Sequence, residues 1–222
     1  MTISMASDLA TLDILLDAVI KQDDARPRTQ QVELGPSSLG SCKRQVVMKI
    51  MGLDPINPVE RLPSILGTAI HAMIESALRE SGHDSVELEV PGLPGLLGPG
   101  HIDFYQPGRK TITDWKTTQK KHLRHFPKMS QIWQVQTYGY LAKAAGFEVE
   151  WVELVAIPRD GTSKDVKLHR ELYSETKAVE AIDGLRGRQA EAFNGVLPEA
   201  EMNAANFCRP YCPFFGAYCS GL

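Results

Sequence analysis

Two acidic residues and a lysine lie near the ends of two neighbouring predicted strands. Asp103 belongs to the first strand, at about residues 100–105, and Asp114 and Lys116 lie at the end of the second, at about 111–115. Because the side chains of a strand alternate between its faces, Asp114 and Lys116 share one face. Carboxylates hold hard divalent cations through oxygen, and a lysine orients or deprotonates water and stabilises charge on a phosphate. The pattern indicates metal-assisted phosphodiester cleavage, or else an ordinary surface hairpin that carries Asp and Lys.

A histidine lies upstream on a predicted helix at about residues 63–81, which Pro63 and Ser64 open. It stands beside an apolar stripe with helical spacing, made of Leu66, Ile70, Met73, Ile74 and Leu78. His71 therefore faces the interior or its edge, where a histidine needs a hydrogen-bond partner or a metal. A metal ligand and an ordinary core histidine both fit this position.

A second predicted helix, at about residues 130–145, carries two further polar side chains on one face. Gln134 and Tyr138 are four residues apart, which places them side by side on a helix. Such a pair is able to hold a phosphate, a base or the water used by the lysine. The same spacing occurs on any half-buried helix face with polar tips, so the pair by itself does not decide between these functions.

The order of the predicted elements supplies the context for these residues. A helix at 63–81 is followed by strands at 86–90, 100–105 and 111–115, a helix at 130–145 and a strand at 152–157. A further strand at 166–172 and a long helix at 174–193 extend the series. Helices and strands in this order predict an α/β fold.

With these elements and motifs, the chain resembles the PD-(D/E)xK nuclease superfamily. The resemblance implies that superfamily's restriction-endonuclease-like αβββαβ core, a central mixed sheet flanked by helices. The match is closer to its RecB-like branch, which carries a G-x-x-x-H helix, a G-x-x-D strand, a D/E-x-K strand and a Q-x-x-x-Y helix. All four motifs occur here in order, and they end at His71, Asp103, Lys116 and Tyr138. The resemblance implies a DNA nuclease and gives roles to the residues of the motifs.

The resemblance implies a catalytic Mg²⁺ or Mn²⁺ whose ligands are His71, Asp103, Asp114 and the backbone carbonyl of Trp115. It makes Lys116 the catalytic lysine and implies that Gln134 and Tyr138 position DNA or that lysine. The histidine and the Gln–Tyr pair favour the RecB-like exonucleases over endonucleases of the same fold.

The four cysteines fall on both sides of the predicted nuclease core. Cys42 precedes it, and Cys208, Cys212 and Cys219 lie within the last fifteen residues. A disulfide framework is disfavoured, because four cysteines in 222 residues are sparse and no secretory segment is found. A structural zinc site and a [4Fe–4S] cluster each take four thiolates, and spacing alone does not separate them.

One cysteine before the core and three after it resembles the iron–sulfur RecB-like nucleases, which include AddB and the CRISPR-associated exonucleases of the Cas-four type. Those proteins often carry an S-x-L-x-x-C-x-R element, and residues 37–44 match it. The resemblance implies a [4Fe–4S] cluster, with structural Zn²⁺ as the alternative, that joins the N- and C-terminal segments of the fold. Such a cluster indicates a reducing, cytoplasmic setting.

Length and composition fit one globular domain with a net charge of −3 and no apolar run that could span a bilayer. We divide the chain into an N-terminal helix and linker at 1–30 and a single nuclease domain at 31–222, which includes the cysteine cluster at 208–219. The N-terminal helix, at about 9–20, has an apolar face and by default packs onto its own domain. A polar linker follows it at 21–31.

Positive charge is concentrated between residues 109 and 128, which contain seven Lys or Arg and one acidic residue. This segment runs from the strand of Asp114 towards the helix of Gln134, so a phosphate backbone entering the site would pass along it. A solvated basic loop has the same composition. The DNA contacts that we predict are Lys120, Lys121 and Arg124, together with Arg44.

The inferences combine into a metal-dependent DNA exonuclease that serves recombination, replication or CRISPR-adaptation-type end processing. The alternative is an iron–sulfur subunit that binds DNA ends, cuts little and acts through a partner. The expected partners are single-stranded or duplex DNA ends and a helicase, recombinase or CRISPR-adaptation protein. A homo-oligomer is also compatible with the sequence, and no membrane is expected.

Overall fold

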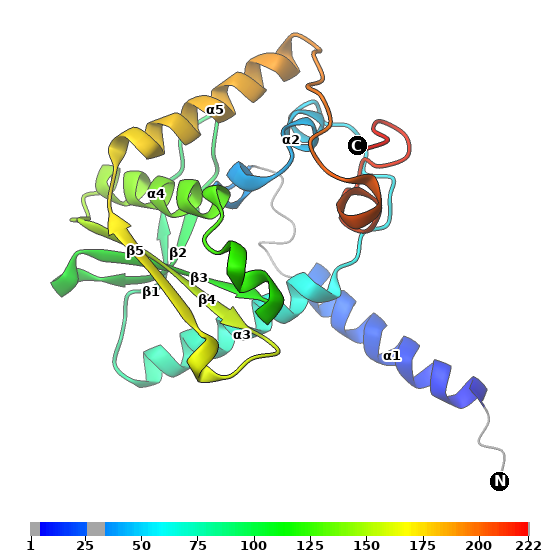
Figure 1. Cartoon of the computed structure of the whole chain (residues 1–222), viewed down its shortest axis with the longest axis horizontal. Helices are drawn as coiled ribbons and strands as arrows, with labels where there is room; N and C mark the ends of the chain where they lie inside the picture. Colours follow the sequence, from blue (N-terminus) through cyan, green and yellow to red (C-terminus); the bar gives the residue numbers. More distant parts are fainter. Residues whose placement is uncertain (1–4, 26–33, 222) are drawn as a thin grey trace.

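The computed structural model describes residues 5–25 and 34–221 and has three layers (Figure 1). The middle layer is a five-stranded mixed sheet in the order β1-β2-β3-β4-β5. Its strands are β1 (Val86–Val90), β2 (Gly100–Gln106), β3 (Thr111–Thr118), β4 (Trp151–Pro158) and β5 (Lys167–Leu172). Strands β3 and β4 are parallel, and each other neighbouring pair is antiparallel.

Helices cover both faces of the sheet. In Figure 1, α3 (Leu62–Glu80) lies below the sheet, α4 (Met129–Ala144) lies above it, and α5 (Glu175–Phe193) packs on α4. Helix α4 is the crossover that parallel strands such as β3 and β4 require. The other helical segments are α1 (Met5–Asp24), η1 (Pro36–Gly40), α2 (Lys43–Ile50), η2 (Pro107–Arg109), η3 (Lys120–His125), η4 (Ser163–Asp165), η5 (Ala204–Cys208) and α6 (Arg209–Tyr211).

The predicted α/β fold and its αβββαβ core order are confirmed. The largest difference in a core element is at β3, which continues through Thr118 instead of ending near residue 115. The reason is that β3 pairs with β4 along its whole length, as far as Thr118 opposite Pro158. Helix α2 and the 3-10 turn η3 lie where no element was expected.

The main core lies between α4 and the sheet. Ile112 of β3, Val152 and Leu154 of β4, and Leu141 of α4 are all at most 1% exposed. Parallel central strands are covered on both faces and therefore need apolar side chains in close succession. Burial of each such side chain contributes about 1.5–3 kcal/mol, and this packing fixes the strand that carries Asp114.

The N-terminal helix differs from its prediction in length and in packing. Helix α1 continues to Asp24, so residues 21–24 of the predicted linker are helical, while residues 26–31 lie outside the described residues. The expected packing of its apolar face was wrong, because α1 projects from the body (Figure 1) and Leu12 and Leu15 are 55% and 57% exposed. The helix meets the domain through its polar C-terminal end.

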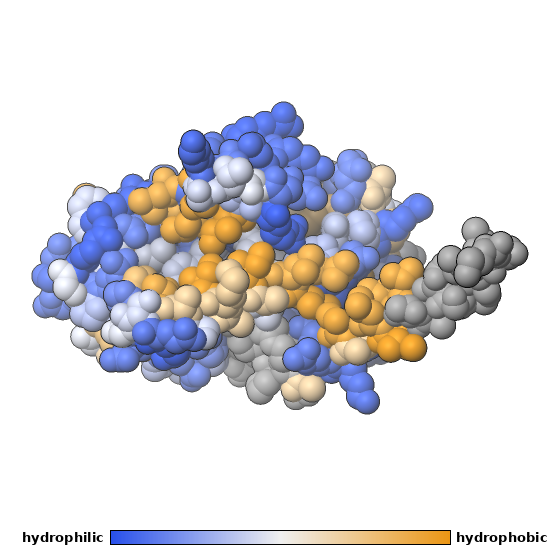
Figure 2. All heavy atoms as spheres, turned by 90° about the horizontal axis from the view of Figure 1, so that it is seen from below, coloured by the Kyte–Doolittle hydropathy of each residue, from blue (hydrophilic) through white to orange (hydrophobic). Residues whose placement is uncertain are grey.

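The apolar stripe of α3 is only partly buried. Ile70 and Ile74 are half-buried, whereas Leu66 and Met73 are 46% and 64% exposed. Apolar side chains also form a band on the face of the molecule shown in Figure 2. The expectation that the stripe faces the interior therefore holds only for its inner residues. Within the described part of the chain, no helix combines the length and the apolar character needed to cross a bilayer.

Hydrogen bonds join the segments that precede α3 and follow α5. Arg44 donates from Nη1 to the carbonyl of Pro198 at 2.9 Å and from Nη2 to the carbonyl of Tyr218 at 3.1 Å. The side chain of Asn57 donates to two further carbonyls of the C-terminal segment, at 2.9 and 2.8 Å. The N- and C-terminal segments are therefore adjacent, as the sequence predicted.

Candidate active site

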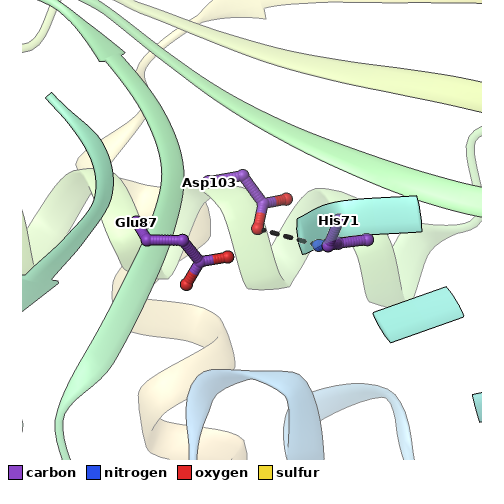
Figure 3. Close-up of side chains that lie close together, drawn as sticks. All are labelled: His71, Glu87 and Asp103. Carbon is purple, nitrogen blue, oxygen red and sulfur yellow. Dashed lines mark hydrogen bonds and ion pairs between the residues drawn. The ribbon is translucent and has the colours of Figure 1, made fainter. Parts of the chain in front are cut away.

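Three potential cation ligands converge from α3, β1 and β2. His71 Nδ1 lies 3.2 Å from Asp103 Oδ1, and the carboxylate of Glu87 points towards the same space from β1 (Figure 3). One ligand atom from each residue lies within 4.8 Å of the other two. Carboxylate oxygens together with an imidazole nitrogen are a donor set that suits a divalent transition-metal cation such as Mn²⁺, and the carboxylates suit Mg²⁺.

Glu87 was not predicted as a site residue. The antiparallel register of β1 and β2 sets it opposite Asp103. Its φ is +52°, a left-handed value that costs a non-glycine residue about 1–2 kcal/mol, and strain of this kind gathers at functional sites. The sequence offered no signal that could single out Glu87. Glu89 has the same place in the alternation of apolar and acidic residues along β1, yet it is exposed.

Beside this group, two side chains hold Lys116. Its Nζ lies 2.8 Å from Oδ2 and 3.1 Å from Oδ1 of Asp114, and it donates to Gln134 Oε1 at 2.8 Å. Gln134 Nε2 donates to the hydroxyl oxygen of Tyr138 at 3.2 Å. The two predicted pairs, Asp114 with Lys116 and Gln134 with Tyr138, therefore form one network across β3 and α4.

Asp103 connects the two groups. Its Oδ1 faces His71, and its Oδ2 accepts a hydrogen bond from the backbone N–H of Trp115 at 2.8 Å. The buried ring of Trp115 stands edge-on to the imidazole of His71, with the ring centroids 6.4 Å apart. All the predicted catalytic residues thus lie in one region. The metal-ligand roles predicted for His71, Asp103, Asp114 and the Trp115 carbonyl stay predictions.

The electrostatics of the site favour added positive charge. Burial raises the pKa of Asp114 to about 6, with Lys116 acting against this shift and Asp103 adding to it. Burial lowers the pKa of His71, but the hydrogen bond to Asp103 and the charge of that carboxylate outweigh burial, so the net pKa is raised. Carboxylates that are buried beside one another are costly to ionise, and a bound cation would offset that cost.

The site opens into a cleft of about 1130 Å³. His71, Glu87 and Lys116 line it, together with other residues of α3 and the C-terminal end of α1. The lysine and two of the three potential cation ligands are therefore accessible from one continuous space. A cleft of this size and openness accepts an extended ligand.

Three of the predicted DNA contacts lie on η3, directly after β3. Lys120, Lys121 and Arg124 are all exposed. Lys120 forms an ion pair with Asp165 at 2.8 Å. Arg44 is not grouped with them, because its guanidinium is engaged with the C-terminal segment.

The three C-terminal cysteines belong to an apolar cluster that includes Met48 of α2, and Cys42 lies close to them. Cys208 and Cys212 pack with Met48, Cys42 is also buried, and Cys219 is half-buried. All four are free thiols. Burial, and then the proximity of the other three cysteines, raises the pKa of the Cys208 thiol. The cysteines predicted to act together are therefore neighbours in space.

None of the protein-family models and none of the curated proteins compared with this chain matches it. Solved structures share its fold. The crystal structure of SSO0001 has a TM-score of 0.55 and 18% identity over 92% of this chain and 94% of that chain. An alkaline exonuclease (LHK-Exo) from Laribacter hongkongensis has a TM-score of 0.53 and 15% identity over 76% of this chain and 91% of that one.

The same exonuclease in complex with dAMP has a TM-score of 0.50 and 14% identity over 74% of this chain and 89% of that chain. At such identities these likenesses show the fold alone. The mixed sheet and its flanking helices are thus an architecture that exonucleases also have.

Proposed function

We propose that this chain is a metal-dependent deoxyribonuclease of the PD-(D/E)xK, RecB-like type that degrades DNA from its ends. The observation that carries the proposal is the convergence of His71, Glu87 and Asp103 beside Lys116 in one open cleft. Cation ligands next to a positioned lysine are what phosphodiester hydrolysis needs. The shared fold with an alkaline exonuclease supports this reaction class by analogy.

His71, Glu87 and Asp103 would hold the divalent cation, with Asp114 and the Trp115 carbonyl as further predicted ligands. The donor set of carboxylate oxygens and one imidazole nitrogen fits such an ion, and the buried carboxylates need positive charge beside them. When bound, Mg²⁺ or Mn²⁺ supplies Lewis acidity at a phosphate oxygen and promotes the ionisation of water.

Lys116 acts on the phosphate in this proposal. An ammonium group has three N–H donors, and Asp114 and Gln134 accept two of them. Because Lys116 also lines the cleft, its third N–H donates to a non-bridging phosphate oxygen, where negative charge grows during attack. Gln134, hydrogen-bonded to Tyr138, keeps Nζ in this position.

DNA is the proposed substrate because exposed basic side chains directly follow β3, the strand that carries Asp114 and Lys116. Lys120, Lys121 and Arg124 lie on η3, which begins two residues after β3 ends. Positive side chains in such a position attract and orient a phosphate backbone. An exonuclease is favoured because the motifs resemble the RecB-like branch, and a neighbour of the same fold is an exonuclease.

The test is degradation of end-labelled linear DNA, single-stranded and duplex, beside circular single-stranded DNA. Wild type, Lys116→Ala and Lys49→Ala are compared with Mg²⁺, with Mn²⁺ and with EDTA. Lys49 is an exposed lysine of α2 and provides a control of equal charge. Circular dichroism confirms that the three proteins are folded.

We expect metal-dependent loss of linear DNA with wild type and Lys49→Ala and about a 100-fold or greater loss of rate with Lys116→Ala. Circular DNA should remain whole. Cleavage of the circle would indicate an endonuclease. A folded, metal-supplied wild type that cuts no DNA but binds its ends would overturn the proposal in favour of an end-binding subunit.

We also propose that the four cysteines hold a [4Fe–4S] cluster. Cys208 and Cys212 pack in an apolar cluster, and, besides burial, Cys42 and Cys219 are close enough to raise the pKa of Cys208. Four neighbouring thiolates are the ligand set that a four-iron cluster takes. The resemblance of one cysteine before the core and three after it to the iron–sulfur RecB-like nucleases favours this cluster over structural zinc.

Metal and sulfide analysis of anaerobically purified protein tests this cluster. Wild type and Ser41→Ala should contain iron and acid-labile sulfide in equal amounts, and Cys42→Ser should lose most of both. Ser41 neighbours Cys42 and controls for disturbance of this turn. One zinc per chain without iron would establish the alternative.

The setting that we propose is DNA end processing in recombination, replication or CRISPR adaptation, with a helicase, recombinase or adaptation protein as partner. Four free thiols fit a reducing, cytoplasmic compartment. Affinity capture with the metal-supplied chain in the presence of DNA ends would identify such a partner.

A further inference from the structure

The C-terminal end of α1 lies against the start of α3 at one end of the cleft. Arg61 immediately precedes α3, and its Nη2 lies 2.5 Å from Oδ2 of Asp23 and its Nη1 2.6 Å from Oδ1 of Asp24. The side chain of Asp23 is 12% exposed and that of Arg61 is 25% exposed. All three residues line the same cleft as His71 and Lys116.

We propose that Arg61 is a subsite for a phosphate of the DNA strand and that Asp23 and Asp24 occupy it in the free protein. The inference rests on DNA being the ligand of the cleft, as in the proposed function. The planar guanidinium fork presents two terminal nitrogens to two anionic oxygens, which is also how arginine binds a phosphate. The carboxylates therefore hold the positions that two non-bridging phosphate oxygens would take.

The position of Arg61 fits a strand that also reaches the proposed cation ligands. Along α3, the cleft-lining residues Arg61, Ser64, Thr68 and His71 recur every three or four residues and so form one row. Ten residues of helix separate Arg61 from His71, a rise of about 15 Å. This distance exceeds the spacing of successive phosphates on a strand, so Arg61 would contact a phosphate other than the reacting one.

The acidic pair is not explained by the stability of its own helix. Asp23 and Asp24 are the last two residues of α1, where the helix dipole disfavours negative charge. The exposed apolar residues of α1 also show that little burial holds the helix in place. The ion pairs to Arg61 thus attach this end of α1. The pair with Asp24, whose side chain is 59% exposed, exchanges partners at low cost.

In the free protein, the two carboxylates both neutralise Arg61 and repel a phosphate backbone at the cleft. A DNA strand must therefore displace them before it reaches Lys116. This arrangement weakens the binding of short or weakly charged ligands more than that of a continuous polyanion, which makes several phosphate contacts at once.

Binding of a fluorescein-labelled single strand of about 12 nucleotides tests the subsite by fluorescence anisotropy. The full chain carries Lys116→Ala, and EDTA is present, so that no cleavage occurs. Asp23→Asn/Asp24→Asn is compared with Asp13→Asn/Asp17→Asn, which removes the same charge from two exposed positions of the same helix. Arg61→Gln is measured alone and in combination with Asp23→Asn/Asp24→Asn. Far-ultraviolet circular dichroism checks that each variant is folded.

We expect Asp23→Asn/Asp24→Asn to tighten binding about tenfold and the control pair less than about twofold, because screened charges away from the cleft contribute little. Arg61→Gln should weaken the tightened variant about tenfold and lower the slope of log K against log salt by about one. The inference is overturned if both pairs tighten binding equally, if the gain persists with Arg61→Gln, or if no variant binds the strand. The cleavage assay on wild type tests the proposed nuclease activity separately. If wild type cleaves DNA but the two double substitutions tighten binding equally, only the Arg61 subsite is refuted.

Discussion

Replacing Glu87 by glycine separates its proposed function from its structural cost. At a φ of +52°, Glu87 has a backbone conformation that costs a non-glycine residue about 1–2 kcal/mol. Glycine removes this cost, but its greater freedom in the unfolded chain opposes folding by about 0.5–1 kcal/mol. In EDTA, the free energy of unfolding of Glu87→Gly should therefore equal that of wild type or exceed it by up to about 1.5 kcal/mol.

Glu89→Gly is the matched control. Glu89 lies two residues further along β1, is exposed, and is not among the non-glycine residues with positive φ, which in the described chain are Glu87 and Lys110. Only the cost of glycine applies there, so the two variants should differ by about 1–2 kcal/mol. For a chain of this length, that is a difference of about 2–8 °C in Tm.

The same substitution should weaken cation binding. Removing residues that merely orient metal ligands weakens binding about 10- to 100-fold, so removal of a ligand carboxylate should raise the Kd for Mn²⁺ at least about 100-fold, or about 2.8 kcal/mol. Glu87→Gln should show this loss with no change in backbone preference. Thermal unfolding in EDTA and calorimetric Mn²⁺ titration measure the two effects. The reasoning is refuted if Glu87→Gly is destabilised as much as Glu89→Gly and binds Mn²⁺ like wild type.

Two further predictions concern the packing and charges that support the site. A Cβ on Gly40 would lie 2.4 Å from the Cβ of Ser130, so Gly40→Ala should destabilise the chain by about 1–3 kcal/mol, and Ser130→Gly in the same chain should restore most of the lost Tm. Burial raises the pKa of Glu171, but hydrogen bonds led by that from Lys177 lower it more, to a net value below the usual 4.5. Glu171 therefore contributes stability above pH 4.5 that is lost as the pH falls through its lowered pKa. Glu171→Gln should lower Tm by about 2–4 °C at pH 7, and the difference from wild type should disappear in acid. A Tm difference that persists there would contradict this account.

Much of the site was predictable because its residues follow local periodicities. Alternation along β3 places Asp114 and Lys116 on one face, and helical spacing places Gln134 beside Tyr138. The structure joins these two pairs through the 2.8 Å hydrogen bond from Lys116 to Gln134. The order of helices and strands was enough to bring them together, because short connections leave few ways to pack this series of elements.

Other features depend on contacts between residues far apart in the sequence. Glu87 and Glu89 are equivalent in the strand pattern, and only the pairing of β1 with β2 sets Glu87 opposite Asp103. The ion pairs of Arg61 join residues 37 and 38 positions apart, and no local pattern encodes them.

The sequence by itself determined the elements, their order and the faces that the catalytic candidates share, because hydrophobic periodicity and local backbone preference act within a few residues. Only the tertiary structure decided that α1 leaves its apolar face exposed, that Glu87 joins His71 and Asp103, and that the end of α1 lines the cleft. These outcomes follow from strand register and from competition among long-range contacts, whose free energies differ by a few kcal/mol and have no local signature.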